Sequence, residues 1–237
     1  MRLVLENISK SFGENHVLKD ISFEFDQGNI YALLGRNGSG KTTLLSIIAE
    51  ELQADNGSVY ITNDQNEKRL LQEDDFFFMV ANPNFPNFLT GYEFIKFFFD
   101  VNQDRIHTNK SIDEYLDWIG LDEDERHRLI QGYSLGMKNK LQMLMFVMLE
   151  PPIILMDEPL TSLDVIMQHQ IKKLILHMKS RHIILFSTHI LQLATDLCDE
   201  IVILNNGKLK LLDHQMLENQ EFEEEIIKAL GEVESNV

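Results

Sequence analysis

A glycine-rich run near the start of the chain has the residue types needed to hold a polyphosphate. Residues 35–42, Gly-Arg-Asn-Gly-Ser-Gly-Lys-Thr, match the pattern G-x-x-x-x-G-K-[ST]. Glycines let the backbone curl so that its N–H groups point at phosphate oxygens, while Lys41 would reach the β- and γ-phosphates and the Thr42 hydroxyl would bind Mg²⁺. The run predicts a nucleoside-triphosphate site made by Gly35, Arg36, Asn37, Gly38, Ser39, Gly40, Lys41, Thr42 and Thr43.

The residues on either side of this loop support the prediction. Residues 29–34 indicate a short buried strand, and residues 43–50 have the apolar spacing of a helix. A helix that begins at the loop would place its positive dipole end on the phosphates. The alternative is a glycine-rich turn with a solvated lysine, which the flanking strand and helix make much the weaker interpretation.

Two acidic residues follow a second apolar run. Residues 153–156, Ile-Ile-Leu-Met, indicate a buried strand that leads directly into Asp157 and Glu158. Parallel strands present their carboxyl ends to one crevice, so both carboxylates would face the phosphate loop. Asp157 is suited to hold Mg²⁺, and Glu158 is suited to orient the attacking water or accept its proton. The alternative, an Asp-Glu-Pro turn that caps the next helix, is weaker because a phosphate loop precedes it.

A histidine lies at the end of the next apolar run. Residues 183–186 indicate the strand after the acidic pair, and Ser187, Thr188 and His189 follow at its end. A lone histidine is more often structural, but one at this edge of the sheet could contact the γ-phosphate. We therefore place His189 in the same site.

Composition limits the possible partners and compartments. The net charge is −17, from 38 acidic and 21 basic residues, whereas a protein that tracks along nucleic acid needs a basic footprint. Nucleic acid is therefore not expected as the main partner. The first residues lead into a strand pattern rather than a signal sequence, and the most apolar stretch, 141–156, is too interrupted to span a bilayer. The single cysteine, Cys198, fits a reducing cytoplasm and is expected to be a small buried hydrophobe.

The pattern along the chain predicts an α/β fold. Residues 2–8 and 16–25 alternate apolar and polar side chains, as in a partly exposed antiparallel sheet. Apolar strands that alternate with helices after residue 150 predict a parallel sheet covered on both faces. We expect a nucleotide-binding core with an antiparallel β subdomain at 1–84 and 151–215, a helical subdomain at 85–150, and an acidic C-terminal helix or tail at 216–237.

The order and spacing of these motifs resemble the nucleotide-binding ATPase domain of ABC transporters, over roughly residues 1–215. The resemblance implies a P-loop NTPase of the ABC type, with ATP and Mg²⁺ as cofactors. It implies that residues 35–42 are Walker A, that residues 153–158 are Walker B with Glu158 as catalytic carboxylate, and that His189 is the switch histidine. By the same resemblance Phe12 would stack on adenine, and residues 162–164 would form the D-loop, with Asp164 at the nucleotide.

The resemblance also identifies residues 133–138, Tyr-Ser-Leu-Gly-Met-Lys, as the family's signature motif, usually L-S-G-G-Q. Ser134 and Gly136 precede a helix expected at 137–149, so a hydroxyl and backbone N–H groups form a second anion site. One γ-phosphate is not easily reached by both sites of one chain. In the family the two sites belong to different subunits, which implies a two-fold dimer, either a homodimer or a heterodimer with a related ATPase, around two ATP.

Two features depart from the family pattern. Leu135 and Met137 replace glycine and glutamine of the signature, and similar Y-S-x-G-M versions occur with ABC-2-type exporters of drugs, bacteriocins or peptides. The Q-loop glutamine expected after the strand at 76–80 is missing, and Ala81 and Asn82 align with it. Alanine could not bind Mg²⁺, so Asn82, one methylene shorter than glutamine, is the candidate metal ligand.

The region after this loop is rich in aromatic residues, and helical spacing makes about two-thirds of them core residues. The resemblance implies that the others receive a helix of a separate membrane permease, which would hold the chain as a peripheral subunit at the cytoplasmic face of the membrane. We therefore expect the ATP-hydrolysing subunit of a bacterial ABC transporter, an exporter by its signature. The alternative is a soluble ABC ATPase without a permease, like the iron–sulfur-cluster assembly ATPase.

Overall fold

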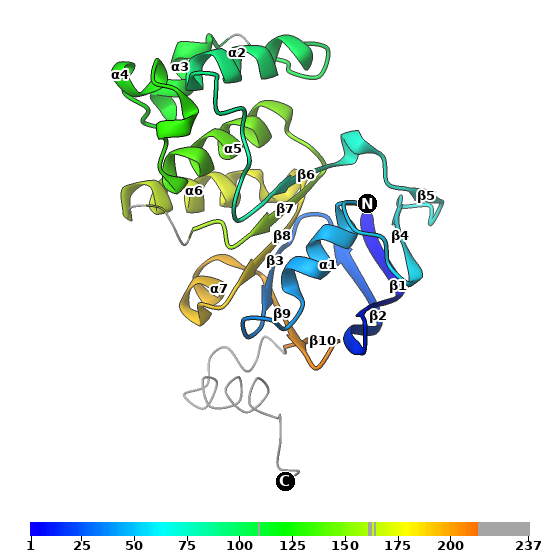
Figure 1. Ribbon diagram of the computed structural model, residues 1–237. Coiled ribbons are helices and arrows are strands. Elements are labelled where there is room, and N and C mark those ends of the chain that lie inside the picture. The colour runs from blue at the N-terminus through cyan, green and yellow to red at the C-terminus, as the bar shows by residue number, and fades with distance from the viewer. Residues whose placement is uncertain (109, 161–162, 164, 213–237) are drawn as a thin grey trace. The chain divides into compact units, whose positions relative to one another are not determined.

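The computed structural model describes residues 1–108, 110–160, 163 and 165–212 (Figure 1). Asp164 and the expected acidic tail at 216–237 lie outside these residues. The chain divides into two compact units. Unit 1 contains Met1–Phe78, Pro152–Glu158 and the described residues from Leu174 onward, and unit 2 contains Met79–Pro151 and the described part of Pro159–Lys173.

A six-stranded sheet with the order β10-β9-β3-β8-β7-β6 is the centre of unit 1. β3 pairs in parallel with β8 and β9, β7 pairs in parallel with β8, and β10 runs antiparallel to β9. Every residue of β3, β7 and β8 is buried, as expected for parallel strands with both faces covered. The strands are β3 (Ile30–Leu34), β6 (Phe76–Met79), β7 (Ile153–Asp157), β8 (Ile183–Thr188), β9 (Glu200–Asn205) and β10 (Lys208–Leu211).

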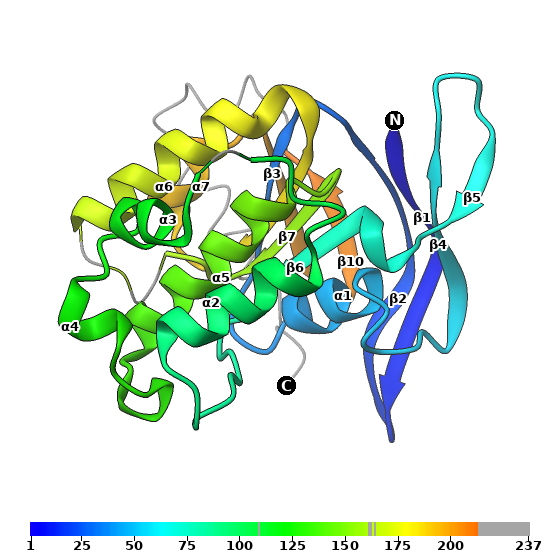
Figure 2. The same cartoon turned by 90° about the horizontal axis from the view of Figure 1, so that it is seen from above.

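Helices cover both faces of this sheet. α1 (Lys41–Ile48) and α7 (Leu191–Leu197) lie on opposite faces, as the two views together show (Figures 1 and 2). A short 3₁₀ helix, η3 (Lys179–Arg181), leads into β8. This arrangement leaves the carboxyl ends of β3, β7 and β8 at one edge, where the loops that carry polar residues begin.

The antiparallel sheet of unit 1 has the strand order β2-β1-β4-β5. Its strands are β1 (Arg2–Phe12), β2 (Asn15–Asp26), β4 (Asn56–Thr62) and β5 (Lys68–Leu70). Leu3 of β1 lies opposite both Phe25 of β2 and Ile61 of β4, and all three side chains are buried. They share one hydrophobic core with residues of α1 and of the parallel sheet, among them Leu45 and Leu155, so both sheets support the same helix.

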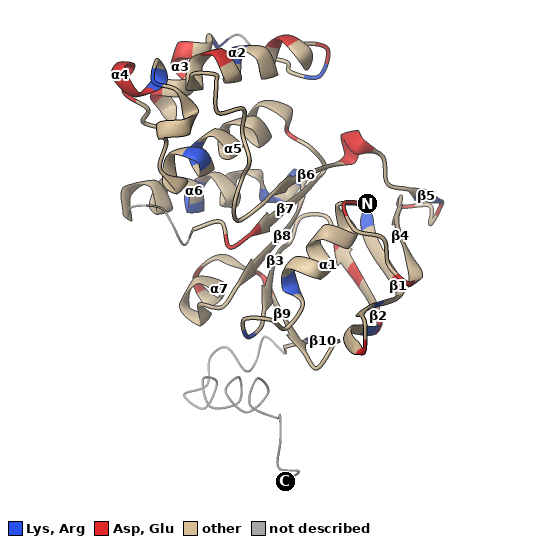
Figure 3. Ribbon diagram, in the orientation of Figure 1, with Lys and Arg blue, Asp and Glu red and all other residues tan. Residues whose placement is uncertain are grey.

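Unit 2 is helical in the part that the structure describes. It contains α2 (Gly91–Val101), α3 (Ile112–Trp118), α4 (Glu123–Arg126), the 3₁₀ helix η2 (Ile130–Gly132), α5 (Leu135–Leu149) and the start of α6 (Val165–Met178). Capping boxes begin α2 and α3, where Thr90 pairs with Glu93 and Ser111 with Glu114. Acidic residues gather in the first turns of α3 and α4 (Figure 3), where they favour the positive ends of the helix dipoles.

One predicted boundary is wrong, for a local reason. α5 begins at Leu135 instead of 137, because Ser134 caps the helix by accepting the N–H of Met137, so Gly136 lies in the first turn. Residues 63–75 contain β5 and the 3₁₀ helix η1 (Glu73–Asp75). No helix in the described part of the chain is both long and apolar enough to cross a bilayer.

Candidate active site

The glycine-rich loop joins β3 to α1 in unit 1, and its backbone needs glycine at three positions. Gly38 and Gly40 have φ of 82° and 104°, in the left-handed region that other residues rarely adopt. A Cβ on Gly35 would lie 2.5 Å from Ser39 Oγ and 2.8 Å from the Leu204 carbonyl oxygen. Gly40 also precedes α1 without any side-chain cap, so the first N–H groups of the helix are available to an anion.

The loop borders a polar hollow of about 350 Å³. The hydroxyl of Ser39 is buried there and has no hydrogen-bond partner within the described part of the chain. A buried hydroxyl without a partner is costly, and a phosphate oxygen is an acceptor that would satisfy it. The hollow is lined by Asn15, His16, Val17, Lys19, Arg36, Asn37, Gly38, Ser39, Asn205, Asn206 and Gly207.

Lys41 supplies a buried positive charge beside this loop. Its side chain is almost inaccessible, and Nζ donates hydrogen bonds to the carbonyl oxygens of Gly35 (2.8 Å) and Arg36 (3.4 Å). Burial lowers the pKa of Lys41, and the charges of Glu158 and Asp157 partly oppose this effect. An ammonium group that has lost its water interacts strongly with phosphate oxygens, because little screening remains.

Thr42 and Asp157 form a pair of oxygen ligands suited to Mg²⁺. Thr42 Oγ1 donates to Asp157 Oδ2 at 2.8 Å, although the two residues are 115 positions apart. Among the described residues, no group of three or more His, Cys, Asp or Glu side chains converges to hold a metal ion. A cation at this pair would therefore take its other ligands from phosphate and water, which is how Mg²⁺ is usually bound. The residues present fit that ion.

Glu158 is the carboxylate placed to act on water. It follows β7 with a positive φ of 50°, and its N–H donates to Ser187 Oγ of β8 at 3.0 Å. Its Oε1 lies 2.8 Å from His189 Nδ1 and 3.9 Å from Lys41 Nζ. Ser187 Oγ also donates to Asp157 Oδ1, so one buried hydroxyl on β8 holds both acidic residues at the end of β7.

The structure brings together five of the predicted residues: Lys41, Thr42, Asp157, Glu158 and His189. Sequence reasoning assigned no role to Ser187, and its only signal was a small hydroxyl residue two positions before the histidine. It also assigned no role to His16, Val17 or Asn206, which line the hollow.

Other predicted residues make none of these contacts in the described part of the chain. Phe12 is half exposed and lies under Lys10 Nζ, 5.6 Å from the ring centroid, and it is not part of the lining of the hollow. Asn82 is exposed and belongs to unit 2, as do the two signature residues Ser134 and Gly136. Burial raises the pKa of the Cys198 thiol to about 12, so this side chain is not a ready nucleophile.

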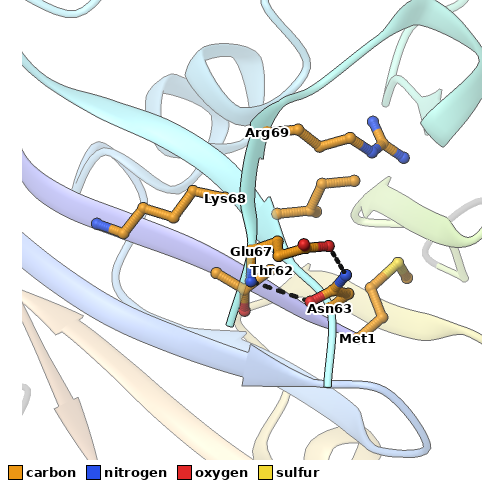
Figure 4. A pocket seen from close by; sticks show the side chains of 7 residues that line it. Met1, Thr62, Asn63, Glu67, Lys68 and Arg69 are labelled. Carbon is orange, nitrogen blue, oxygen red and sulfur yellow. Dashed lines mark hydrogen bonds between the residues drawn. The ribbon is translucent and has the colours of Figure 1, made fainter. Parts of the chain in front are cut away.

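A second hollow of similar volume lies on the antiparallel sheet (Figure 4). Its lining includes Asn63 and Glu67, and these two residues satisfy each other: Asn63 Nδ2 donates to Glu67 Oε2 at 2.7 Å, and Asn63 Oδ1 accepts the Glu67 N–H. Arg69, which also lines this hollow, donates two hydrogen bonds to Asp75. The glycine-rich loop and the ends of β7 and β8 are therefore the candidate active site.

Comparison with known proteins gives a consistent result. Residues 18–161 match the family model described as ABC transporter. The uncharacterized ABC transporter ATP-binding protein YdbJ of Bacillus subtilis is 33% identical over 211 residues, which are 88% of this chain and 68% of that protein. The bacitracin transport ATP-binding protein BcrA of Enterococcus faecalis is 31% identical over 86% of this chain and 66% of its own length.

Solved structures share the fold. A structure described as the ATP binding subunit of an ABC transporter superposes with a TM-score of 0.79 and 25% identity, covering 98% of this chain and 100% of that one. A dimeric ATP-binding cassette, MJ0796, bound to ADP and Pi has a TM-score of 0.73 at 23% identity, covers 89% of this chain and 99% of that one, and supports the fold alone. The predicted fold class, an ABC-type P-loop NTPase with a mixed sheet and an antiparallel β subdomain, is confirmed. The chain belongs to the ABC transporter family, as an ATP-binding subunit that hydrolyses ATP.

Proposed function

We propose that this subunit dimerises around two ATP molecules with Mg²⁺ and drives a separate membrane permease, in the direction of export. The convergence of Lys41, Glu158 and His189 in unit 1 carries the catalytic part of the proposal. The resemblance described above, together with relatives whose printed names describe transport, supports the permease and the direction.

The nucleotide would be held mainly by backbone and by charge. The N–H groups at the start of α1, together with Ser39 Oγ and Lys41 Nζ, would bind the phosphates. Thr42 and Asp157 would hold Mg²⁺, which supplies neutralisation of the charge that develops on the transferred phosphoryl group. Asn82 remains a predicted third ligand of Mg²⁺: it belongs to unit 2, whereas Thr42 and Asp157 belong to unit 1.

Glu158 would orient the attacking water and accept its proton. Its carboxylate interacts with Lys41 and His189, and phosphate oxygens would compete for both of these groups. As the phosphates attract Lys41, its interaction with Glu158 weakens, and the carboxylate is left to the attacking water. His189, which is about half exposed, would then be available to the γ-phosphate.

The second anion site supports a dimer. Ser134 caps α5, Gly136 lies in its first turn, and that turn contains no acidic residue. A helix N-terminus with a free face binds anions, and in ABC cassettes the signature acts on the nucleotide of the other subunit. The signature and Asp164 of one subunit would thus complete the nucleotide pocket that Walker A forms in the other subunit.

An exposed apolar surface at α2 supports a helical partner. Phe88, Phe97 and Val101 expose 78%, 60% and 66% of their surface, and Phe97 and Val101 are four residues apart on one side of the helix. Large apolar side chains in such positions are typical interface anchors. A permease helix is the partner that the resemblance implies, and it would hold this chain at the cytoplasmic face of the membrane.

Import is a second candidate for the direction of transport. A relative named as a probable sulfate/thiosulfate import ATP-binding protein, CysA of Chlorella vulgaris, is 30% identical over 88% of this chain. The signature Tyr-Ser-Leu-Gly-Met favours export, because the resemblance links this version to ABC-2-type exporters. Reconstitution with the permease in vesicles of known orientation would decide between the two.

Glu158→Gln tests the catalytic proposal. We expect turnover to fall by roughly 10²–10⁴-fold, because amide nitrogen and oxygen cannot take the proton. ATP binding should persist, and a stable ATP-bound dimer should appear in size-exclusion chromatography. Glu51→Gln, an exposed residue after α1, is the matched control and should hydrolyse ATP normally. A Glu158→Gln protein with the turnover of the native chain would refute the assignment.

Affinity purification from membranes of the host tests the partner. We expect a polytopic membrane protein to copurify, and Phe97→Asp to reduce its recovery by at least tenfold. Leu70→Asp, which places the same charge at an apolar residue of unit 1 that is somewhat more exposed, should not reduce it. Recovery of soluble partners alone would instead favour an ATPase that works without a permease.

A further inference from the structure

A buried glutamine on α5 holds the segment that occupies the place of the Q-loop. Gln142 is 5% exposed and lies two turns into the helix from the signature residue Ser134. Its Oε1 accepts the N–H of Val80 at 3.0 Å, and its Nε2 donates to the carbonyl oxygen of Val80 at 2.9 Å. One side chain therefore satisfies both backbone groups of the residue that directly follows β6.

The same segment is fixed at its other end to the residues that precede α5. The N–H of Ile130 donates to the Leu89 carbonyl oxygen at 2.8 Å, and Thr90 forms an isolated β-bridge with Leu129. Gly91 lies directly beneath Tyr133, since a Cβ there would be 2.1 Å from the Tyr133 hydroxyl. We call residues 80–91 the strap, because both of its ends are bonded to the stretch 129–142 within unit 2.

Gln142 is placed for these bonds rather than for packing. Its neighbours Leu141, Met143 and Leu144 are apolar and fully buried, so an apolar side chain would suit the position equally well by volume. A buried amide is unfavourable unless its donor and acceptor are both used. In Gln142 both groups bond to the backbone of Val80, 62 residues away in the sequence, and Nε2 also lies 3.3 Å from Asn139 Oδ1.

We propose that Gln142 is a positioning residue that makes the strap move together with the signature helix. A change at Ser134 on nucleotide binding is then passed along α5 to Val80, and through the strap to Phe88 and the start of α2. The inference rests on the proposed function, because those residues form the surface assigned to the permease. It explains how a chain without a Q-loop glutamine can still link the signature to that surface: the glutamine is on the helix instead of the loop.

Hydrogen exchange tests the link directly. Gln142→Met keeps the volume and removes both bonds, and Gln142→Glu keeps the acceptor but removes the donor. Met143→Leu, a volume-conserving change at the next buried residue of α5, is the control. All variants are made in the Glu158→Gln protein, and amide exchange of residues 80–91 and 134–149 is followed with and without ATP and Mg²⁺.

Without nucleotide, we expect the Val80 amide to exchange about tenfold faster in Gln142→Met than in its parent, and by an intermediate factor in Gln142→Glu. With ATP, both segments of the parent and of Met143→Leu should gain protection together, whereas in Gln142→Met only residues 134–149 should gain it. Unchanged Val80 exchange in Gln142→Met, or a joint response of both segments in that variant, would overturn the inference. If ATP protects neither segment even in the parent, the proposed dimer is refuted. The comparison without nucleotide still tests whether Gln142 holds the strap.

Discussion

Replacing Ser187 by alanine is expected to weaken stability and catalysis together. Its hydroxyl is fully buried at the end of β8, where it accepts the Glu158 N–H at 3.0 Å and donates to Asp157 Oδ1. Alanine fits the same space, so the change removes hydrogen bonds without adding steric strain. The two groups left behind are a backbone N–H and a carboxylate oxygen, both at the active site.

The magnitude follows from the number of groups left unsatisfied. A buried donor or acceptor without a partner costs about 1–3 kcal/mol, and two groups lose theirs here. Asp157 keeps the Thr42 hydroxyl, which places the sum at roughly 2–4 kcal/mol. For a chain of this size that corresponds to a fall of roughly 5–15 °C in the unfolding midpoint. Turnover should fall at least about tenfold, because Glu158 loses the bond that holds its left-handed backbone.

The assay combines thermal unfolding with steady-state ATP hydrolysis on the same preparations. Ser22→Ala is the matched control: its hydroxyl accepts one hydrogen bond from the exposed Asn7 N–H at 3.0 Å, and its loss should change stability by less than about 0.5 kcal/mol. Ser187→Ala should also change the KM for ATP less than kcat, since the loop that binds phosphate is untouched. If Ser187→Ala matches Ser22→Ala in both midpoint and kcat, the role assigned to the hydroxyl is wrong.

Three further predictions concern glycine packing and acid stability. Gly35→Ala should raise the Kd for ATP at least tenfold in a binding assay, because its Cβ would lie 2.8 Å from a backbone carbonyl oxygen of β9; unchanged affinity would contradict this. Gly91→Ala should lower the free energy of unfolding by about 1–3 kcal/mol, because its Cβ would meet the Tyr133 hydroxyl. The double variant with Tyr133→Phe should lose less stability than the two single variants added together. Strictly additive losses in chemical unfolding would exclude the close contact. Arg69 donates two hydrogen bonds to Asp75 and lowers the pKa of that carboxyl. The Asp75 carboxylate therefore stabilises the fold fully above its unfolded pKa of about 3.9. This contribution is lost as the pH falls through the lower pKa of the folded state. Asp75→Asn should therefore flatten the loss of stability on acidification, as measured by unfolding between about pH 5 and 2; an unchanged slope would count against it.

Much of the site could be predicted because its requirements are local. The loop at Gly35–Thr42 needs glycine for backbone reasons and a lysine at one fixed offset, and both are visible in a single sequence. The acidic pair Asp157 and Glu158 ends an apolar run, and a buried parallel strand must deliver its last residues to the edge of the sheet. Local pattern and fold thus point to the same place.

The remaining parts depend on pairings that no local pattern encodes. Ser187 interrupts an apolar run, and the sequence alone does not distinguish it from any small residue that a strand tolerates. Its role depends on the pairing of β8 with β7, which puts its hydroxyl beside Asp157 and Glu158. Gln142 is one polar position among buried apolar ones, and its partner is 62 residues away. The apolar pattern predicts a helix from 137, whereas the cap at Ser134 starts it at Leu135.

The charges around the hollow indicate what a triphosphate must bring with it. Lys41, Arg36 and Lys19 are the cationic side chains at or beside the site, and the carboxylates of Asp157 and Glu158 oppose them. The small positive excess cannot balance the several charges of a triphosphate, so the side chains of unit 1 alone do not neutralise it. In the proposed site, Mg²⁺ and helix N-termini would supply the rest. α1 offers one such N-terminus in unit 1 and the signature helix α5 offers another in unit 2, and in the proposed dimer each nucleotide would meet one from each of two copies of this fold.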